Sequence, residues 1–367
     1  MRASVIIDNH NYAEFLPAAI ESALGQTTSA EVIVVDDGST DRSRDVITEY
    51  EGRVRAVLKP NGGQASALNA GFEASAGDVV CFLDADDLLA PTAMEAAIEA
   101  LASTEAVKAH WPLWLIDRDG VRSGELAPRG ELCCGDLRDL VTMRGPGSHS
   151  DPPTSGNAWR RGYLESVLPI PLEYRSCADA YLLELAPLFG PIARLPAPQG
   201  SYRLHGENGC AGMSFDDRIR HELTLHERNC DAVAAACLRL GIAFDRADWC
   251  EDHWSRDLAH CAADIASAVP PGEAFVLVDE DKLSMDGHAG RDAVPFPERD
   301  GIYWGRPADD AAAVAELERQ RERGLRYMVF AWTAFWWLDH YAGLHRRLRD
   351  RGRLKLSTDR ARVFALD

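Results

Sequence analysis

Acidic side chains gather directly after two short apolar stretches of this 367-residue chain. The stretches are EVIVV at 31–35 and DVVCFL at 78–83, and each is typical of a buried β-strand. Because ligands bind beyond the carboxyl ends of parallel strands, we expect these side chains to meet at one functional edge. Crowded carboxylates are costly unless a cation or hydrogen-bond donors compensate them. The five residues are Asp36, Asp37, Asp84, Asp86 and Asp87.

The spacing Asp84-Ala85-Asp86 indicates a site for a divalent cation. Mg²⁺ and Mn²⁺ prefer oxygen ligands and leave positions open for the oxygens of a bound phosphate. An isolated D-x-D is more often a solvated, capped turn. Here it follows a buried strand and shares its sheet edge with Asp36 and Asp37, which favours the metal site over the turn.

The first 110 residues alternate between strand-like and helix-like stretches. This alternation predicts a doubly wound, mostly parallel α/β sheet with helices on both faces. Helices are expected to begin near Pro17 and Pro91, which suit a first turn, and after the capping residue Ser39. The other expected elements are strands at 4–7, 31–35, 54–58 and 78–83 and a helix at 64–75.

The turn after the first strand excludes two common kinds of nucleotide-binding protein. It reads Asp8-Asn9-His10-Asn11 rather than G-x-G-x-x-G, and the chain contains no G-x-x-x-x-G-K-[ST]. A dinucleotide-dependent oxidoreductase or a P-loop NTPase is therefore not expected.

A less regular part follows residue 110, and a second α/β unit follows that. Stretches at 111–117 and 121–125 predict a β-hairpin around Asp119-Gly120. Pro and Gly are dense between 145 and 171, which predicts a long ordered loop or a mobile lid. In the second unit we expect strands at 274–279, 326–332 and 362–366 and helices at 311–323 and 334–349. The expected domains are 1–215, a helical extension at 216–269 and a smaller C-terminal α/β domain at 270–367.

Composition limits the partners and the compartment. The 58 acidic residues outnumber the 39 basic ones, for a net charge of −19. Because nucleic-acid binding relies on a basic surface, nucleic acid is not an expected partner. Nine cysteines without any C-x-x-C indicate reduced thiols in a cytoplasmic protein. The start, MRASVIIDNHNY, lacks the features of a signal peptide. No apolar run approaches the roughly 20 residues of a membrane span. We expect a cytoplasmic protein, at most attached to the inner face of the cell membrane.

Four segments, in this order, resemble the family 2 glycosyltransferases. The resemblance covers about residues 3–210 and implies a GT-A fold and an inverting transfer of sugar from a nucleoside diphosphate, with UDP the expected nucleotide. A sugar nucleotidylyltransferase is disfavoured because its Gly-rich, Arg-containing loop is missing after the first strand. The segments are SVIIDNHNYAEFLPAAIESALGQT (4–27), VIVVDDGSTD (32–41), NGGQASALNAGFEASAGDVVCFLDADD (61–87) and CADAYLLELAPLFGPIARLPAPQGSYRLHGENG (177–209).

The resemblance also implies which residues hold the donor. Relatives commonly have Pro where Asp8 stands, and either Asp36 or Asp37 would accept the ring N–H of the base. Asp86 would ligate Mg²⁺ or Mn²⁺ directly, and His205 is a candidate further ligand. The donor-binding candidates are Asp8, Asn9, Asn11, Asp36, Asp37, Asn61, Gln64, Asn69, Asp84 and Ala85.

Asp179 aligns with the family's catalytic base, although Ala178 replaces the Glu that often precedes it. In an inverting mechanism this carboxylate removes the proton of the acceptor hydroxyl. A glycan, a glycolipid or a small molecule would be the acceptor. The candidates on the acceptor side are Ser155, Gly156, Asn157 and Trp159. A degenerate relative that only binds a nucleotide sugar or a glycan is the alternative.

The C-terminal domain carries no catalytic signature, and its role is open. Its aromatic stretch around Trp336 and Trp337 is expected to form core. Residues 340–355 hold six basic side chains and one acidic one, which is typical of a solvated helix face. The same excess would also suit peripheral association with an anionic membrane.

Overall fold

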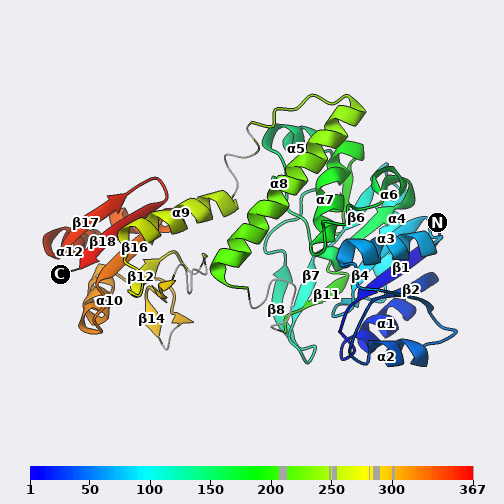
Figure 1. The fold of residues 1–367 in the computed structure, drawn as a ribbon, viewed down its shortest axis with the longest axis horizontal. Helices are drawn as coiled ribbons and strands as arrows, with labels where there is room; N and C mark the ends of the chain where they lie inside the picture. The colour runs from blue at the N-terminus through cyan, green and yellow to red at the C-terminus, as the bar shows by residue number, and fades with distance from the viewer. Residues whose placement is uncertain are drawn as a thin grey trace. The chain divides into compact units, whose positions relative to one another are not determined.

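The computed structural model describes residues 1–205, 213–247, 249, 254–280, 282–283, 290–299 and 302–366. They form two compact units, one of residues 1–211 with 225–250 and the other of residues 212–224 with 251–367. Helix α8 (Phe215–Leu240) contributes to both units, while α9 (Trp254–Ala268) lies in the second (Figure 1). The span 216–269, expected as a helical extension, contains α8 and α9. The part of α8 from residue 225 onward belongs to the first unit, whereas the start of α8 and all of α9 belong to the second.

The first unit is built on a seven-stranded sheet of order β10-β6-β9-β4-β1-β2-β3. All neighbours described in it are parallel except β9, which runs antiparallel to both β4 and β6. The expected mostly parallel α/β sheet is thus confirmed. Its strands are β1 (Ala3–Asn9), β2 (Ala30–Asp37), β3 (Arg55–Lys59), β4 (Val79–Asp84), β6 (Lys108–His110), β9 (Asn157–Arg160) and β10 (Ile192–Arg194).

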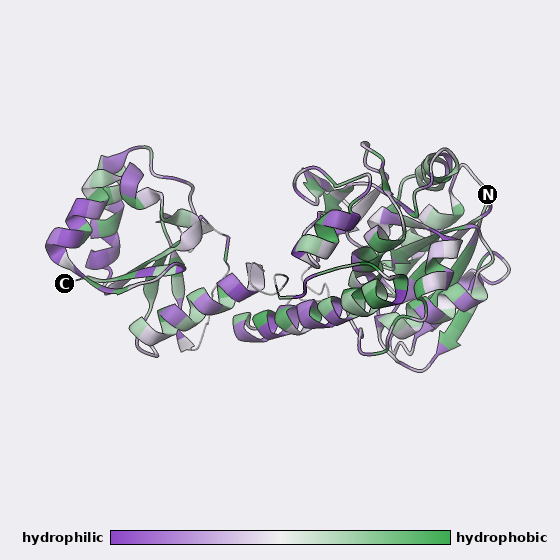
Figure 2. Ribbon diagram, turned by 90° about the horizontal axis from the view of Figure 1, so that it is seen from above, coloured by the Kyte–Doolittle hydropathy of each residue, from purple (hydrophilic) through white to green (hydrophobic). Residues whose placement is uncertain are grey.

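Helices cover both faces of this sheet, which explains why its strands are continuously apolar (Figure 1). Along β1, Val5 and Ile7 enter the core with α1 and α4, whereas Ile6 enters the core with α3 and α7. In Figure 2 the hydrophobic colour accordingly gathers on the strands near the N-terminus. The helices of this unit besides α8 are α1 (Leu16–Leu24), α2 (Ser43–Glu49), α3 (Gln64–Ala74), α4 (Ala93–Ala102), α5 (Arg138–Arg144), α6 (Arg161–Val167) and α7 (Ala178–Phe189).

A smaller sheet of order β5-β11-β7-β8 contains the predicted hairpin. Strands β7 and β8 pair antiparallel, and Gly120 takes the left-handed conformation (φ 86°) that the turn requires, so this prediction is confirmed. The strands are β5 (Leu88–Leu89), β7 (Leu113–Ile116), β8 (Arg122–Ala127) and β11 (Gly200–Arg203).

The prediction of a long loop at 145–171 is wrong. The span contains a 3-10 turn (Thr154–Gly156), the strand β9 and the helix α6. Trp159 and Leu164 are buried in the core beside β4 and α7, so apolar packing decides the structure of a segment whose Pro and Gly content predicts a loop.

The second unit packs helices on both faces of a five-stranded sheet of order β13-β12-β16-β18-β17. Its expected strands are confirmed, and β17 is an additional edge strand. In the described part of the chain no helix is long and apolar enough to cross a membrane. The elements are β12 (Phe275–Val278), β13 (Ala293–Pro295), β14 (Glu298–Arg299), β15 (Ile302–Tyr303), α10 (Asp310–Glu322), β16 (Tyr327–Ala331), α11 (Trp337–His340), α12 (Ala342–Arg351), β17 (Gly352–Ser357) and β18 (Ala361–Leu366).

The prediction of a single helix at 334–349 is wrong, because the helical conformation is interrupted at Tyr341 between α11 and α12. Trp337 and Tyr341 are both buried, with ring centroids 5.0 Å apart, and this packing fixes the break. Trp337 is core, as expected, whereas Trp336 is 37% exposed. The basic residues of 340–355 lie on α12 and β17, and Figure 2 shows the helices beside the C-terminus as largely hydrophilic.

Candidate functional site

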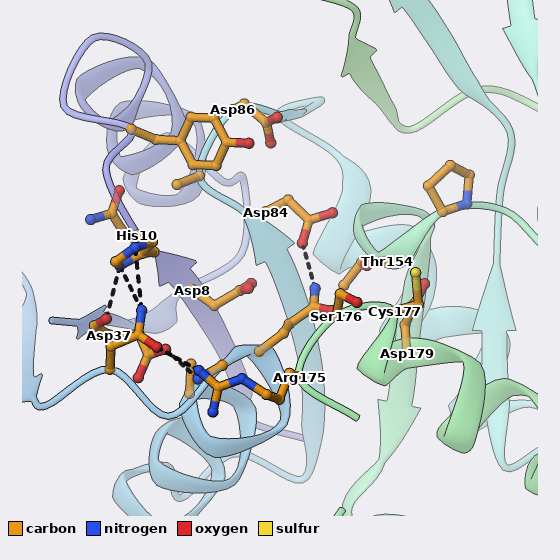
Figure 3. Close-up of a pocket in the computed structure, with 18 of the residues that line it drawn as sticks. Asp8, His10, Asp37, Asp84, Asp86, Thr154, Arg175, Ser176, Cys177 and Asp179 are labelled. Atoms are coloured by element: carbon orange, nitrogen blue, oxygen red, sulfur yellow. Dashed lines mark hydrogen bonds between the residues drawn. The ribbon is translucent and has the colours of Figure 1, made fainter. Parts of the chain in front are cut away.

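A cavity of about 630 Å³ opens at the carboxyl ends of β1, β2 and β4 in the first unit (Figure 3). The sheet topology explains its place, because these neighbouring parallel strands all end there. It brings together nine of the predicted site residues, namely Asp8, Asn9, Asp37, Asn61, Gln64, Asp84, Ala85, Asp86 and Asp179. It is also lined by residues that the sequence did not single out, among them His10, Tyr12, Gly63, Pro153, Arg175, Ser176, Cys177 and Tyr202.

Asp8 and Asp84 face each other across the strand pair β1–β4, in whose register they are partners. The pKa of Asp8 is raised to about 7, first by burial and then by the negative charges of Asp86 and Asp179. Burial and the charge of Asp8 raise the pKa of Asp84 well above its usual range. Oδ1 of Asp8 is buried and has no hydrogen-bond partner among the described residues. The cavity is therefore a place where added positive charge or hydrogen-bond donors would be stabilised.

Gln64, the first residue of α3, links the strand edge to α7. Its Nε2 donates to Oδ1 of Asp84 at 3.3 Å, and its Oε1 accepts from the backbone N–H of Ala178 at 2.9 Å. The preceding Gly63 has φ 84°, and a Cβ there would lie 2.8 Å from Cα of Arg175. Glycine at 63 thus allows α3 and the chain before α7 to approach closely, which places Asp179 at the cavity.

The structure separates the roles of Asp36 and Asp37. Asp37 lines the cavity and accepts from the backbone N–H groups of Gly62 (2.9 Å) and Gly63 (2.7 Å), beside an ion pair with Lys59. Asp36 lies outside the lining, where Arg44 donates to it at 2.8 Å. Burial acts to raise the pKa of Asp36, but hydrogen bonds from Ser39 and Arg44 outweigh it and lower that pKa. Of the pair, Asp37 is the one that lines the cavity.

One rim of the cavity combines the predicted residue Asn61 with His10 and Arg175, which the sequence did not indicate. His10 Nδ1 lies 2.9 Å from the backbone oxygen of Asp37, and Asn61 Nδ2 lies 3.2 Å from each ring nitrogen of His10. Arg175 donates to Oδ1 of Asn61 at 2.9 Å. Figure 3 shows His10, Asp37 and Arg175 on the same side of the cavity, away from Asp179. This side of the cavity is thus lined by polar groups that are hydrogen-bonded to one another.

Asp86 and His205 form the candidate metal position. Nε2 of His205 lies 3.0 Å from Oδ2 of Asp86, and the imidazole packs on Phe15 with ring centroids 4.8 Å apart. Arg203 stabilises the turn that carries Asp86. Its Nε donates to the backbone oxygen of Asp86 (2.8 Å), and its backbone N–H donates to Oδ1 of Asp87 (2.9 Å). Over the described residues, no three His, Cys, Asp or Glu side chains converge into a complete cation site. Asp86 and His205 are therefore two candidate ligands and not a complete cation site.

Asp179 lies in the first turn of α7, and its carboxylate accepts a hydrogen bond from the Thr154 side chain. Burial raises the pKa of Asp179, and the bonds from Thr154 and the backbone of Ala180 only partly offset that effect. Cys177 precedes the helix in the left-handed conformation (φ 53°), which turns the chain into α7. A buried carboxyl group with a raised pKa suits a general base that works near neutral pH.

The predicted acceptor-side residues lie behind the wall of the cavity and outside its lining. Asn157 is fully buried, and its Nδ2 contacts the backbone oxygens of residues 152–154 at 2.9–3.4 Å. Ser155 Oγ accepts from the N–H of Asp84 at 3.1 Å, and Trp159 stacks on Tyr163. Gly156 is buried as well. These residues shape the backbone that presents Pro153 and Thr154, their neighbours in the sequence.

Asn11 and Asn69 are likewise structural in this fold. Asn11 Oδ1 accepts from the N–H groups of Thr40 (2.7 Å) and Asp41 (3.3 Å), which fixes the loop after β2. Asn69 exchanges two hydrogen bonds of 2.8 Å with the backbone of Ile170. Neither side chain lines the cavity.

We expect Asn69→Ala to lower the free energy of unfolding by about 1–3 kcal/mol, because it leaves the N–H and C=O of Ile170 without their partners. Denaturant titration measures this, and nucleotide affinity should be unchanged. Asn61→Ala is the matched control. Since Asn61 lies at the solvated rim, its loss should change stability by no more than about 0.5 kcal/mol. Equal destabilisation by the two variants would contradict the structural role of Asn69.

Comparison with known proteins agrees with this site. Residues 4–131 match the family described as glycosyl transferase family 2. An uncharacterized glycosyltransferase of Nostoc sp. is 39% identical over 214 residues, which are 57% of this chain and 66% of that protein. The chondroitin synthase of Pasteurella multocida is 41% identical over 100 residues, 26% of this chain and 10% of that protein. The chain thus spans just under two thirds of the first relative and a tenth of the second.

Among solved structures, S. aureus TarS 1-349 in complex with UDP is similar at a TM-score of 0.46 and 16% identity, over 72% of this chain and 79% of that one. The match at residues 4–131 establishes the class of the first unit as a glycosyltransferase domain. By this match and the similarity to the Nostoc protein, the chain contains a family 2 glycosyltransferase domain.

Proposed function

We propose that this chain transfers a sugar with inversion from a nucleoside-diphosphate sugar, UDP being the expected nucleotide, to an acceptor hydroxyl. The observation that carries the proposal is one cavity that gathers Asp37, Asp84, Asp86 and Asp179 from three segments of the chain. The base would lie at the rim of Asp37, His10 and Asn61. The diphosphate would lie at Asp84 and Asp86, which leaves Asp179 for the reacting end.

The residues present fit a divalent cation, Mg²⁺ or Mn²⁺. Asp86 offers a carboxylate and His205 an imidazole, both suitable ligands, and the raised pKa of Asp84 reflects carboxylate charge that a cation would offset. Asp84 and Ala85 would face the donor beside it. When bound, the cation would neutralise charge on the departing diphosphate.

The chemical step assigned to the protein is the removal of one proton. Asp179, as carboxylate, takes the proton of the acceptor hydroxyl while that oxygen forms its bond to the anomeric carbon. The bond from that carbon to the diphosphate oxygen breaks, and the nucleoside diphosphate leaves with the electron pair. Attack from the face opposite the leaving group inverts the anomeric configuration. Thr154 holds the carboxylate of Asp179 in place for this transfer.

A degenerate protein that binds a nucleotide sugar or glycan without turnover is the second candidate. Two departures from the family pattern favour it, Ala178 where a Glu is common and Asp8 where a Pro is common. Incubating the pure protein and Mn²⁺ with UDP-, GDP-, dTDP- and CDP-sugars, and measuring release of the nucleoside diphosphate with and without added glycans, separates the two. We expect release from one nucleotide class. Binding of a nucleotide without any release would favour the second candidate.

The acceptor and the place of action are also part of the proposal. A glycan, a glycolipid or a small molecule would supply the hydroxyl. On the segment 340–355, Arg346, Arg349, Arg351, Arg353 and Lys355 are exposed, whereas Arg347 pairs with Glu318. Such a surface suits peripheral contact with an anionic membrane, which would place a glycolipid acceptor within reach.

A further inference from the structure

A buried ionic cluster lies outside the lining of the cavity, centred on Asp151. Lys108 Nζ forms an ion pair with Oδ1 of Asp151, and His110 Nδ1 lies 3.4 Å from the same oxygen. His149 Nε2 lies 2.8 Å from Oδ2 of Asp151, and its Nδ1 lies 4.0 Å from Oε2 of Glu184. We call Lys108, His110, His149, Asp151 and Glu184 the Asp151 cluster.

The cluster is almost fully removed from solvent, since the side chain of Lys108 is 1% exposed and that of His149 is 2% exposed. Lys108 also lies 5.3 Å from the centroid of the Trp159 ring. Burial lowers the pKa of Lys108, and Asp151 opposes that effect. The Lys108 ammonium and the histidines hold the pKa of Asp151 well below its usual range against the effect of burial. An apolar core is usually at least as stable as a buried ion pair, so the cluster calls for a role other than stability.

Two structural connections lead from the cluster to Asp179. The first is the chain itself, because Thr154, which lines the cavity together with Asp179, follows Asp151 by three residues. The second is α7, which carries both Asp179 and Glu184, and Glu184 accepts from the backbone N–H of Gly147 at 2.9 Å.

The cluster also acts on Asp179 through charge. The negative charge of Asp151 raises the pKa of Asp179. Lys108 and Asp179 attract each other, which raises the pKa of Lys108 and by reciprocity lowers that of Asp179. The other titratable groups that act on Asp179 come from β1, β4 and β11, namely Asp8, Asp84 and Tyr202.

We infer that the Asp151 cluster positions Asp179 and sets its protonation, with Lys108 and Asp151 as positioning residues of opposite effect. The inference rests on the proposed function, because it needs Asp179 to act as the base. It extends that function by a layer of residues that touch neither donor nor acceptor.

The test compares Lys108→Met, Asp151→Asn and the double variant at constant Mn²⁺. The probe is the nucleoside-diphosphate sugar that the wild-type protein turns over, and the readout is kcat and kcat/KM against pH. Lys108→Met removes a positive charge, so it should raise the pKa of Asp179 and move the acidic limb of the pH profile to higher pH. Asp151→Asn removes a negative charge, so it should lower that pKa and move the limb to lower pH. The double variant should return the limb toward the wild-type position, since both charges are then gone.

Controls separate positioning from damage to the fold. Arg161→Met removes a half-buried cation whose side chain donates to the backbone oxygen of Gly77 and to Ser75, outside the cluster, and should leave the limb unmoved. KM for the donor should stay within about twofold of the wild-type value in all variants. In Lys108→Met and in Asp151→Asn, kcat should fall by about tenfold or more, which is the size of loss that misplacing a catalytic group produces. Thermal unfolding identifies any variant that fails to fold, and where that variant is Asp151→Asn, Glu184→Gln replaces it as the removal of a negative charge from the cluster.

The outcomes separate a failure of the proposed function from a failure of the inference about the Asp151 cluster. Wild-type protein without turnover of any donor would contradict the proposed function itself. Turnover in the wild-type protein, with the limb unmoved or moved in the same direction by both single variants, would overturn only the inference and show the cluster to be packing. Opposite displacement of the limb that the double variant cancels would support it.

Discussion

Asp179→Asn is expected to bind nucleotide as well as the wild-type protein does and to lose transfer. The substitution keeps the size of the side chain and its hydrogen bond from Thr154, but an amide cannot take the acceptor proton. General-base catalysis typically contributes about 10²–10⁴-fold, and we expect kcat to fall by that factor. Steady-state release of nucleoside diphosphate measures kcat, and calorimetry measures the affinity for UDP.

The pH profile of the wild-type protein gives the same assignment a second test. Burial raises the pKa of Asp179, so the carboxylate form is lost as pH falls through a value above that of an ordinary aspartate. The rate should therefore rise with pH through that point, and the limb should be absent from Asp179→Asn. Asp45→Asn on the exposed face of α2 controls for the change in net charge. Turnover by Asp179→Asn within tenfold of the wild-type rate would show that another group is the base.

Asp86→Asn is expected to remove the dependence of donor binding on metal. It replaces the carboxylate that pairs with His205 by an amide, a weaker ligand without charge. Loss of an outer partner of a metal ligand costs about 10–100-fold in affinity, so loss of the ligand itself should weaken Mn²⁺-dependent UDP binding by about 100-fold or more. Titration with UDP at saturating and zero Mn²⁺ measures this.

His205→Ala provides the graded comparison. It removes the second proposed ligand and leaves Asp86 in place, so UDP affinity in Mn²⁺ should fall less than in Asp86→Asn. Asp45→Asn again controls for charge. Unchanged enhancement by Mn²⁺ in Asp86→Asn would contradict the metal position.

Three of the predicted residues that line the cavity lie at the ends of strands. Asp8, Asp37 and Asp84 follow continuously apolar strands, and the parallel register of β1, β2 and β4 brings those ends to one edge. Pattern and topology suffice there, because the strand determines the place of the residue that follows it. Asp179 needed the family resemblance, since one acidic residue at the start of a helix carries no signal by itself.

The residues that sequence reasoning placed less well are side chains whose partners are distant backbone groups. Asn69 bonds Ile170, 101 positions away, and Asn157 caps the carbonyls of its own turn. An amide of this kind looks the same in a sequence whether it faces a ligand or a backbone. The Asp151 cluster escaped notice for the same reason, because Lys108, Asp151 and Glu184 are single residues that only the fold assembles.

Secondary structure failed where packing overrode composition. The segment 145–171 is rich in Pro and Gly, yet buried Trp159 and Leu164 draw it into the sheet and the core. The expected helix at 334–349 has helical composition, yet the packing of Trp337 against Tyr341 divides it. In both places large apolar side chains decide the outcome, and their partners lie outside any local window.

Calorimetric titration of the wild-type protein with UDP, in the presence and absence of Mn²⁺, tests the central claim most directly. If the cavity at the ends of β1, β2 and β4 holds a nucleoside diphosphate through Asp37 and a cation at Asp86, UDP will bind with 1:1 stoichiometry and much more tightly with Mn²⁺. GDP, dTDP and CDP serve as competitors that define the base. If none of the four nucleotides binds under either condition, the site does not hold a nucleotide-sugar donor, and the assignment of this chain as an active glycosyltransferase is contradicted.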